Sequence, residues 1–231
     1  MSFIKGLFKP DRTKAQEAQS KSEVVAVTGE FSEWFASKEF SADWTSGHFP
    51  SWKVLLASMK DHSARILEIG SYEGFSALFF LNFLPRSFIV CIDPWDTKYM
   101  VSDIAKLVPG VVDEYPRAEG RFDRNLLPFA DRLMKIKAAS ANALAELGIG
   151  GQRFDMIYVD GSHRRLDAYR DCTLSWPLLN SDGIMLIDDY EFGRRLPDDL
   201  KPKQGVDAFL TNIAGQYVEL HRGYQIAVRK Y

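Results

Sequence analysis

The segment from Ile66 to Ser76 constrains the fold more than any other part of the sequence. An apolar run is followed by a turn that contains Gly70 and Gly74, and then by a helical pattern. Glycine at 70 lets the backbone turn sharply and approach a ligand, and glycine at 74 permits close packing where the helix begins. Tyr72 stands where a dinucleotide fingerprint has its middle glycine, and no Gly-Lys-Ser/Thr follows. The segment therefore predicts an α/β pocket for a nucleoside with a small charged tail.

Three further apolar runs end in carboxylates, at residues 88–93, 154–160 and 183–189. The carboxyl ends of parallel strands emerge at one edge of an open α/β sheet, where such sheets bind ligands. Asp93 follows the glycine turn by about 20 residues, which is the spacing of a ribose-binding acid. We expect Asp93 to bind a ribose, although the turn that begins at Asp93-Pro94 would explain it almost as well.

Asp160, Asp188 and Asp189 are expected to converge at the same edge of the sheet. Such a cluster is unfavourable at neutral pH unless protons or a cation neutralise it. An all-oxygen site suits a hard divalent ion such as Mg²⁺, Mn²⁺ or Ca²⁺. The alternative is that Asp188 or Asp189 only caps a helix or lies in a turn.

Residues 68–76 resemble the first motif of class I S-adenosylmethionine (SAM) methyltransferases. The Gly-x-Tyr-x-Gly-x-Ser form is most similar to catechol O-methyltransferase and its metal-dependent relatives. The resemblance implies that Gly70, Tyr72 and Ser76 contact the methionine end of SAM, with Glu68 beside them. A tight turn between a strand and a helix, with no ligand, is the alternative. The full set of predicted cofactor-binding residues is Glu68, Gly70, Tyr72, Gly74, Ser76, Asp93, Ala139 and Ser140.

The last two members of that set rest on the same resemblance. In the catechol-type family the matching Ala-Ser pair lies against adenine, which implies that Ala139 and Ser140 contact the adenine of SAM. Ser140 also stands where the N-cap of a helix over residues 141–147 is expected, and simple capping would explain it equally well.

The family resemblance also bears on the acidic edge. Catechol-type enzymes carry Asp and then Asp-Asn as ligands of a divalent metal, whereas this chain has Asp189 in place of Asn, like the macrocin-type sugar and antibiotic O-methyltransferases. The resemblance thus implies a metal site of Asp160, Asp188 and Asp189. His163 falls on the position of the catalytic lysine, and imidazole can accept a hydroxyl proton near neutral pH. Alternatively, His163 caps or begins a helix over residues 164–179 and faces solvent.

The sequence predicts a Rossmann-like, doubly wound α/β fold with a mostly parallel seven-stranded sheet, as the family resemblance implies. Two alternating runs, 217–221 and 224–229, surround Arg222-Gly223 and predict a C-terminal antiparallel hairpin. We divide the chain into an N-terminal helical or flap segment, 1–50, and a methyltransferase domain, 51–231.

Two segments are less regular. Residues 9–23 are polar and favour a loose segment or an exposed helix. Residues 31–52 are rich in aromatic side chains and turn formers, and either form a flap that brings Trp44, Thr45 or His48 to the pocket or pack in the core. Core packing is the more frequent outcome, and we expect it for Trp34 and Trp52.

The long connection over residues 95–133 contains a predicted helix at 99–107, a loop at 109–120 and a second helix at 121–132. Long connections in compact α/β domains often carry binding function. We expect this one to shape the acceptor site or a homo-oligomer interface, unless it is an ordinary surface elaboration.

Composition excludes several classes of protein. The chain has 231 residues, 46% of them apolar, which indicates one ordinary domain with a full core. A net charge of −2 and a pI near 6.1 give no attraction for nucleic acid. Cys91 and Cys172 are expected to be buried, reduced thiols. The apolar stretch at 75–84 is too short to span a membrane and the N-terminus lacks a signal sequence, so we expect a cytoplasmic protein.

These features together predict a SAM-dependent O-methyltransferase that uses Mg²⁺ or Mn²⁺ and acts on a hydroxyl of a small molecule or sugar. Three alternatives remain open. They are a metal-independent methyltransferase, a nicotinamide-dependent oxidoreductase and a non-catalytic SAM-binding protein.

Overall fold

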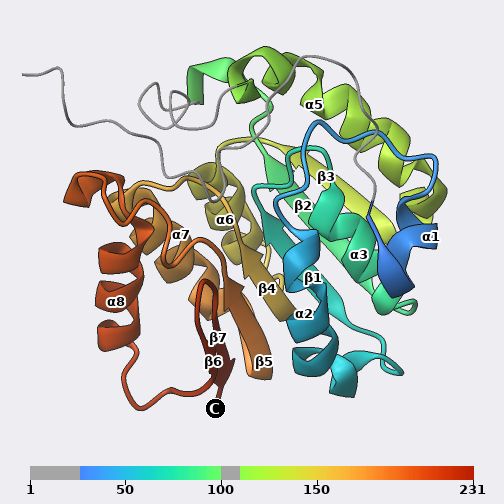
Figure 1. Cartoon of the computed structure of the whole chain (residues 1–231). Helices are drawn as coiled ribbons and strands as arrows, with labels where there is room; N and C mark the ends of the chain where they lie inside the picture. The colour runs from blue at the N-terminus through green and yellow to red at the C-terminus, as the bar shows by residue number, and fades with distance from the viewer. Residues whose placement is uncertain (1–26, 100–109) are drawn as a thin grey trace, which may run out of the picture.

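The computed structural model describes residues 27–99 and 110–231. In this part of the chain, seven strands form one sheet in the order β3-β2-β1-β4-β5-β7-β6, with helices on both faces (Figure 1). The strands are β1 Arg65–Ile69, β2 Phe88–Asp93, β3 Leu133–Lys137, β4 Phe154–Val159, β5 Leu179–Ile187, β6 Tyr217–Arg222 and β7 Ile226–Lys230. The predicted doubly wound α/β fold is confirmed.

The first five strands are parallel, and β7 pairs antiparallel with both β5 and β6, which confirms the predicted C-terminal hairpin. Ile69 is in register with Ile92 of β2 and with Val159 of β4, and Val159 is in register with Ile187 of β5. Four neighbouring strands therefore end at one level. The acids that follow them share one edge of the sheet.

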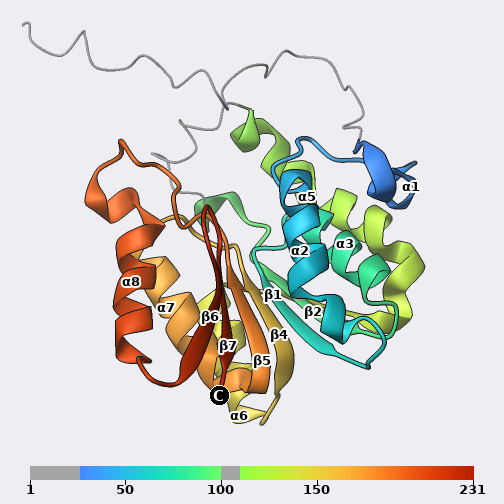
Figure 2. The ribbon, with the colours of Figure 1, turned by 60° about the horizontal axis from the view of Figure 1, so that its bottom comes forward.

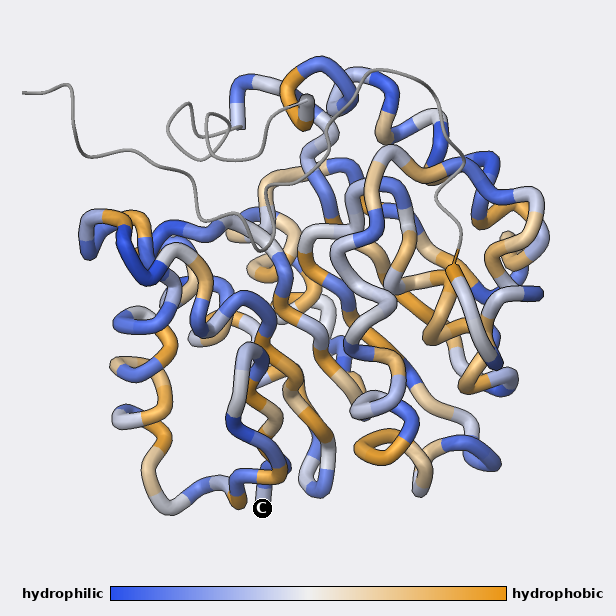
Figure 3. Tube along the Cα trace, in the orientation of Figure 1, coloured by the Kyte–Doolittle hydropathy of each residue, from blue (hydrophilic) through white to orange (hydrophobic). Residues whose placement is uncertain are grey.

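Helices cover the two faces in separate groups (Figure 2). One group contains α1 Ser32–Phe35, α2 Phe49–Leu55, α3 Phe75–Phe83 and α5 Val111–Leu126, and the other contains α6 Ser140–Ile149, α7 Arg165–Ser175 and α8 Pro202–Asn212. Successive strand residues point to opposite faces, so Ile66 packs with the α3 group while Leu67 packs with α6 to α8. Figure 3 shows the hydrophobic residues concentrated along the strands and on the side of α8 that faces them.

The aromatic residues before β1 pack against α3. Phe49 stacks on Phe79 with ring centroids 4.3 Å apart, and Trp52 is fully buried and donates a hydrogen bond to Gln225 Oε1 at 2.7 Å. Trp34 is partly buried against the same cluster, so the core packing predicted for both tryptophans is confirmed. α2 crosses residue 50, where the sequence suggests a boundary, and the domain division stays a prediction.

The long connection differs from its prediction. The loop expected at residues 109–120 is wrong, because α5 runs continuously from Val111 to Leu126 with Pro116 inside it. Tyr115, Ala118, Phe122 and Leu126 recur at helical spacing on its inner side, and this periodicity outweighs the proline signal. Residues 127–132 form a short 3-10 helix. The helix predicted at 99–107 lies outside the described residues except for Tyr99, and the polar segment at 9–23 lies outside them entirely.

Two other expectations concern single features of the chain. Cys91 in β2 and Cys172 in α7 are both buried and free, as predicted. Among the described residues, no helix is long and apolar enough to cross a membrane.

α7 and α8 approach closely at Gly205, where an added Cβ would lie 2.0 Å from the carbonyl oxygen of Arg165. Backbone cannot yield as a flexible side chain can, so we expect Gly205→Ala to lower the free energy of unfolding by about 1–3 kcal/mol. Gly148→Ala in α6 is the control, since its Cβ would meet only Leu178 Cδ2 at 3.7 Å. That change should be neutral or stabilise by up to about 1 kcal/mol. Urea denaturation measures both, and equal effects would contradict the packing argument.

Candidate functional site

The turn between β1 and α3 is held by two close approaches. Gly70 has φ +90°, and a Cβ there would lie 1.9 Å from the carbonyl oxygen of Asp160. Gly74 has φ +80°, and a Cβ there would lie 2.8 Å from Leu126 Cδ1 of α5. The sharp turn and the close packing predicted at these two glycines are therefore confirmed.

Glu68 and Ser76 lie beneath this turn and contact each other. Ser76 Oγ donates a hydrogen bond to Glu68 Oε1 at 2.5 Å, and Cys91 Sγ lies 3.4 Å from Oε2. Burial raises the pKa of Glu68 above its usual range. Both side chains thus sit where the sequence places them, beside the turn, while their contact with methionine stays a prediction.

Asp93 accepts three hydrogen bonds at the end of β2. Its Oδ2 accepts from the Tyr72 backbone N–H at 2.9 Å, and its Oδ1 accepts from the Trp95 N–H at 2.7 Å and from the Tyr115 hydroxyl at 2.9 Å. Burial nevertheless raises the pKa of this carboxyl. The bond to Trp95 is the turn contact that the sequence offered as an alternative. A carboxylate has about four acceptor positions, so these three bonds leave one acceptor position on Oδ2.

The ring of Tyr72 lies between two other aromatic side chains. Its centroid is 5.5 Å from that of Trp44 and 5.8 Å from that of Tyr115, and its hydroxyl lies 3.1 Å from Ser41 Oγ. Trp44 is half exposed. The segment before α2 therefore borders the glycine turn, and the flap over a SAM pocket that would include Trp44 stays a prediction.

Glu73 joins three parts of the chain at this turn, and sequence reasoning assigned it no role. It is buried, its Oε1 pairs with Arg121 of α5 at 2.6 Å, and its Oε2 accepts the backbone N–H of Ser41 at 2.6 Å. Asn125 adds bonds to the backbone of both Glu39 and Glu73. The partners lie 32 and 48 residues from Glu73 along the chain, so no local signal reveals them.

Ser140 does not act as the helix cap that the sequence offered as an alternative. Ala139 occupies the N-cap of α6 without a side-chain bond, and Ser140 is the first helical residue. Its Oγ instead donates to Asp171 Oδ1 of α7 at 2.7 Å. Burial raises the pKa of Asp171 to about 6.

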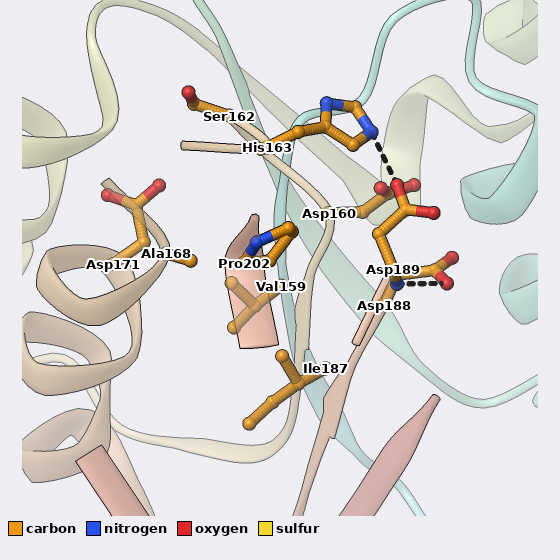
Figure 4. A pocket seen from close by; sticks show the side chains of 11 residues that line it. Val159, Asp160, Ser162, His163, Ala168, Asp171, Ile187, Asp188, Asp189 and Pro202 are labelled. Carbon is orange, nitrogen blue, oxygen red and sulfur yellow. Dashed lines mark hydrogen bonds and ion pairs between the residues drawn. The ribbon is translucent and has the colours of Figure 1, made fainter. Parts of the chain in front are cut away.

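Acidic side chains converge where β4 and β5 end (Figure 4). The hydrogen bonds between the parallel strands continue into the first residue after each strand. Asp160 N–H donates to Ile69 O at 2.8 Å, and Asp188 N–H donates to Val159 O at 2.9 Å. Ligand atoms of Asp160, His163 and Asp189 lie within 4.8 Å of one another. Asp188 is not part of this group, but the buried Tyr158 hydroxyl lies between the two acids, in contact with Asp188 Oδ2 and 3.1 Å from Asp160 Oδ2.

His163 faces Asp189 rather than capping a helix. α7 begins at Arg165 with Arg164 as its N-cap, and His163 Nε2 pairs with Asp189 Oδ2. The His163 side chain is 28% exposed and that of Asp189 is 18% exposed, so the pair sits at the mouth of the cluster. The helix-start interpretation of His163 is therefore wrong.

Burial and mutual repulsion dominate the electrostatics here. Burial raises the pKa of Asp160 well above its usual range, and the charges of Asp188 and Asp189 add to the shift. Burial and the charge of Asp189 raise the pKa of Asp188 to about 6. Burial opposes protonation of His163, yet the charge and hydrogen bond of Asp189 and the charge of Asp188 together outweigh it and raise the pKa of that imidazole. All three shifts favour added positive charge, and a bound cation would supply it.

The raised pKa of Asp188 has a definite consequence for stability. The stability that the protonated Asp188 carboxyl contributes to the fold is fully present below 3.8, the pKa of this group in the unfolded chain. It is lost as the pH rises through about 6, the pKa in the folded chain. In chelator, the free energy of unfolding of Asp188→Asn, measured relative to the parent chain, should therefore be higher at pH 7.5 than at pH 4.5, by on the order of 2 kcal/mol. Urea denaturation at the two pH values measures this difference. Asp131→Asn, at an exposed position, should show none, and an equal change in both variants would contradict the assignment.

Comparisons with known proteins agree with this architecture. A family model described as a methyltransferase domain matches residues 67–190, more than half of the chain. O-methyltransferase hkm8 of Aspergillus hancockii is 30% identical over 126 residues, which cover 54% of this chain and 42% of that protein. The match thus spans less than half the length of this relative.

Solved structures share the fold at low sequence identity. MycE methyltransferase in complex with Mg, SAH and mycinamycin VI gives a TM-score of 0.58 at 18% identity over 87% of this chain and 53% of MycE. An O-methyltransferase from Bacillus cereus in complex with SAH gives 0.58 at 16% identity over 83% and 84% of the two chains. TomG from Streptomyces achromogenes in complex with SAM gives 0.57 at 19% identity over 82% of each chain.

These matches fit the strand order and the glycine turn described above. The family match covers the segment from β1 through the paired aspartates after β5. The chain therefore belongs to the methyltransferase-domain family and has the α/β fold of class I SAM-dependent methyltransferases.

Proposed function

We propose that this chain is a SAM-dependent O-methyltransferase, assisted by Mg²⁺ or Mn²⁺, that acts on a hydroxyl of a small molecule or sugar. The observation that carries the proposal is the convergence of Asp160, His163 and Asp189 at the edge of the sheet. The glycine turn and Asp93 end the neighbouring strands of that edge. Family membership and the Mg, SAH and SAM named for the related structures support it.

The SAM site that we propose lies over β1 and β2. Gly70 lets the backbone approach the ligand, Tyr72 lies at the methionine end, and Asp93 offers Oδ2 to a ribose hydroxyl. Tyr115 already donates to Oδ1, so a second ribose hydroxyl would compete with this phenol. Ala139 and Ser140, beyond β3, would border adenine.

The residues present fit a divalent cation. Asp160 and Asp189 supply carboxylate oxygens, the ligands that Mg²⁺ and Mn²⁺ prefer. The oxygens of Asp188 lie outside the group formed by Asp160, His163 and Asp189, so we assign Asp188 the role of a neighbouring charge rather than of a direct ligand. When bound, the cation would lower the pKa of an acceptor hydroxyl and fix its direction.

His163 is the proposed base. Its imidazole sits at the partly exposed mouth of the cluster, where an entering hydroxyl would meet it. Because Nε2–H donates to Asp189 Oδ2, the neutral imidazole keeps Nδ1 as the nitrogen that accepts a proton near neutral pH, and Asp189 fixes this tautomer. Methyl transfer is a displacement at carbon, so holding the acceptor in line with the SAM methyl supplies much of the acceleration.

One observation favours a second candidate, a metal-independent methyltransferase. The direct pairing of His163 Nε2 with Asp189 Oδ2 is by itself a base with an orienting carboxylate, an arrangement that works without a metal. In that case Asp189 would orient His163, and Asp160 would orient the acceptor. Full turnover in chelator would favour this candidate over the first.

The metal assignment predicts a thermal shift. In chelated buffer, Mg²⁺ or Mn²⁺ added to about a hundredfold over its Kd should stabilise the fold by about 2.7 kcal/mol, or about 5–10 °C in Tm. Asp189→Ala should abolish the shift because it removes an oxygen ligand. Asp131→Ala, at an exposed position, should retain it. A parent chain that shows no shift with SAM and an acceptor analogue present would count against metal assistance.

The SAM assignment predicts a loss of affinity. Asp93→Ala should weaken binding of SAM or S-adenosylhomocysteine by ~1–3 kcal/mol, because a ribose hydroxyl would lose its acceptor. Asp96→Ala is the matched control, since Asp96 lies three residues away and pairs with Lys98. Isothermal calorimetry measures both variants, with NAD as a ligand that should not bind. Equal affinities for Asp93→Ala and the parent chain would remove Asp93 from the site.

A further inference from the structure

The loop between β6 and β7, residues 223–225, returns to the acidic edge of the sheet. Ile226 of β7 pairs with Ile187 of β5 in antiparallel register, which sets the loop beside the residues that follow β5. Tyr224 donates a hydrogen bond from its hydroxyl to Asp189 Oδ1 at 2.5 Å. A residue 35 positions away from Asp189 in the sequence therefore contacts it directly.

Asp189 adopts a backbone conformation that separates it from Asp188. Its φ of +56° lies in the left-handed region, which aspartate tolerates better than most residues. Its N–H donates back to Asp188 Oδ1 at 2.6 Å. The two adjacent carboxylates thus have different partners. Asp188 accepts a hydrogen bond from Tyr158, and Asp189 pairs with His163.

The two oxygens of Asp189 have different partners. Oδ1 accepts from Tyr224, and Oδ2 faces His163. A donor fixed on Oδ1 sets the rotation of the carboxylate, so that Oδ2 stays directed toward His163 and Asp160. A phenol does this without adding charge.

The Tyr224 ring is itself held in place. His48 stacks on it with ring centroids 5.7 Å apart and ring planes 14° from parallel. His48 also stacks on Trp52, with ring centroids 6.3 Å apart. The neighbouring Gln225 accepts the Trp52 indole N–H at 2.7 Å. The donor to Asp189 is therefore fixed by packing as well as by its own hydrogen bond.

We infer that Tyr224 is a positioning residue that fixes Asp189 so that its Oδ2 faces His163 and converges with Asp160 on the cation. This inference rests on the proposed metal-assisted function. Outer hydrogen-bond partners of metal ligands commonly change metal affinity by about 10–100-fold when removed. Tyr224 lies outside residues 67–190, so the family match does not include it.

The test is Mn²⁺ binding by the whole chain, measured from the electron paramagnetic resonance signal of free Mn²⁺. Tyr224→Phe deletes only the hydroxyl and keeps the ring that stacks on His48. We expect its Kd for Mn²⁺ to rise about 10–100-fold. Tyr217→Phe is the matched control, because Tyr217 lies in the same hairpin and packs with the α6–α8 cluster. It should bind Mn²⁺ as the parent chain does.

The outcomes separate this inference from the proposed function. If Tyr224 were only structural, Tyr224→Phe would lower Tm in chelator and leave the Mn²⁺ Kd unchanged, and the inference would be overturned. If the parent chain itself bound no Mn²⁺, both the metal assignment and this inference would fall. A weaker Kd in Tyr224→Phe alone supports the positioning role.

Discussion

Burial of negative charge at the carboxyl edge of the sheet is the constraint on which the site depends. Parallel pairing brings Asp93, Asp160 and Asp188 to one level, and Asp189 follows directly. Carboxylates removed from water are unfavourable unless hydrogen bonds, protons or cations compensate them. The pKa of Asp93, Asp160 and Asp188 is raised by this burial. The fold therefore holds these acidic groups in a state that favours binding of positive charge.

Tyrosine hydroxyls supply much of the compensation. Tyr115 of α5 donates to Asp93, Tyr158 of β4 donates to Asp188, and Tyr224 of the hairpin loop donates to Asp189. A phenol donor satisfies one oxygen and adds no charge, so the local excess of negative charge persists. Each carboxylate keeps a fixed direction as a result, which a binding or catalytic site requires.

Segments outside the family match complete the site. Residue 41 bonds to Glu73 through its backbone, His48 stacks on Tyr224, and Tyr224 holds Asp189. The segment before β1 and the C-terminal hairpin also contribute to the hydrophobic core, since Trp52 is fully buried and Ile226 pairs with β5. The same contacts that stabilise these segments therefore bring their side chains to the acidic edge.

The sequence by itself determined the elements and the order of the acidic positions. Alternating or apolar runs predicted the strands, glycines 70 and 74 predicted the turn, and acids at strand ends predicted one shared edge, because these signals are local. Tertiary structure decided the rest. α5 formed through Pro116 because its inner side packs on the core, and Ser140 turned to α7 instead of capping. Only contacts between distant segments could separate Asp188 from Asp189, since their identical side chains differ in which tyrosine each meets.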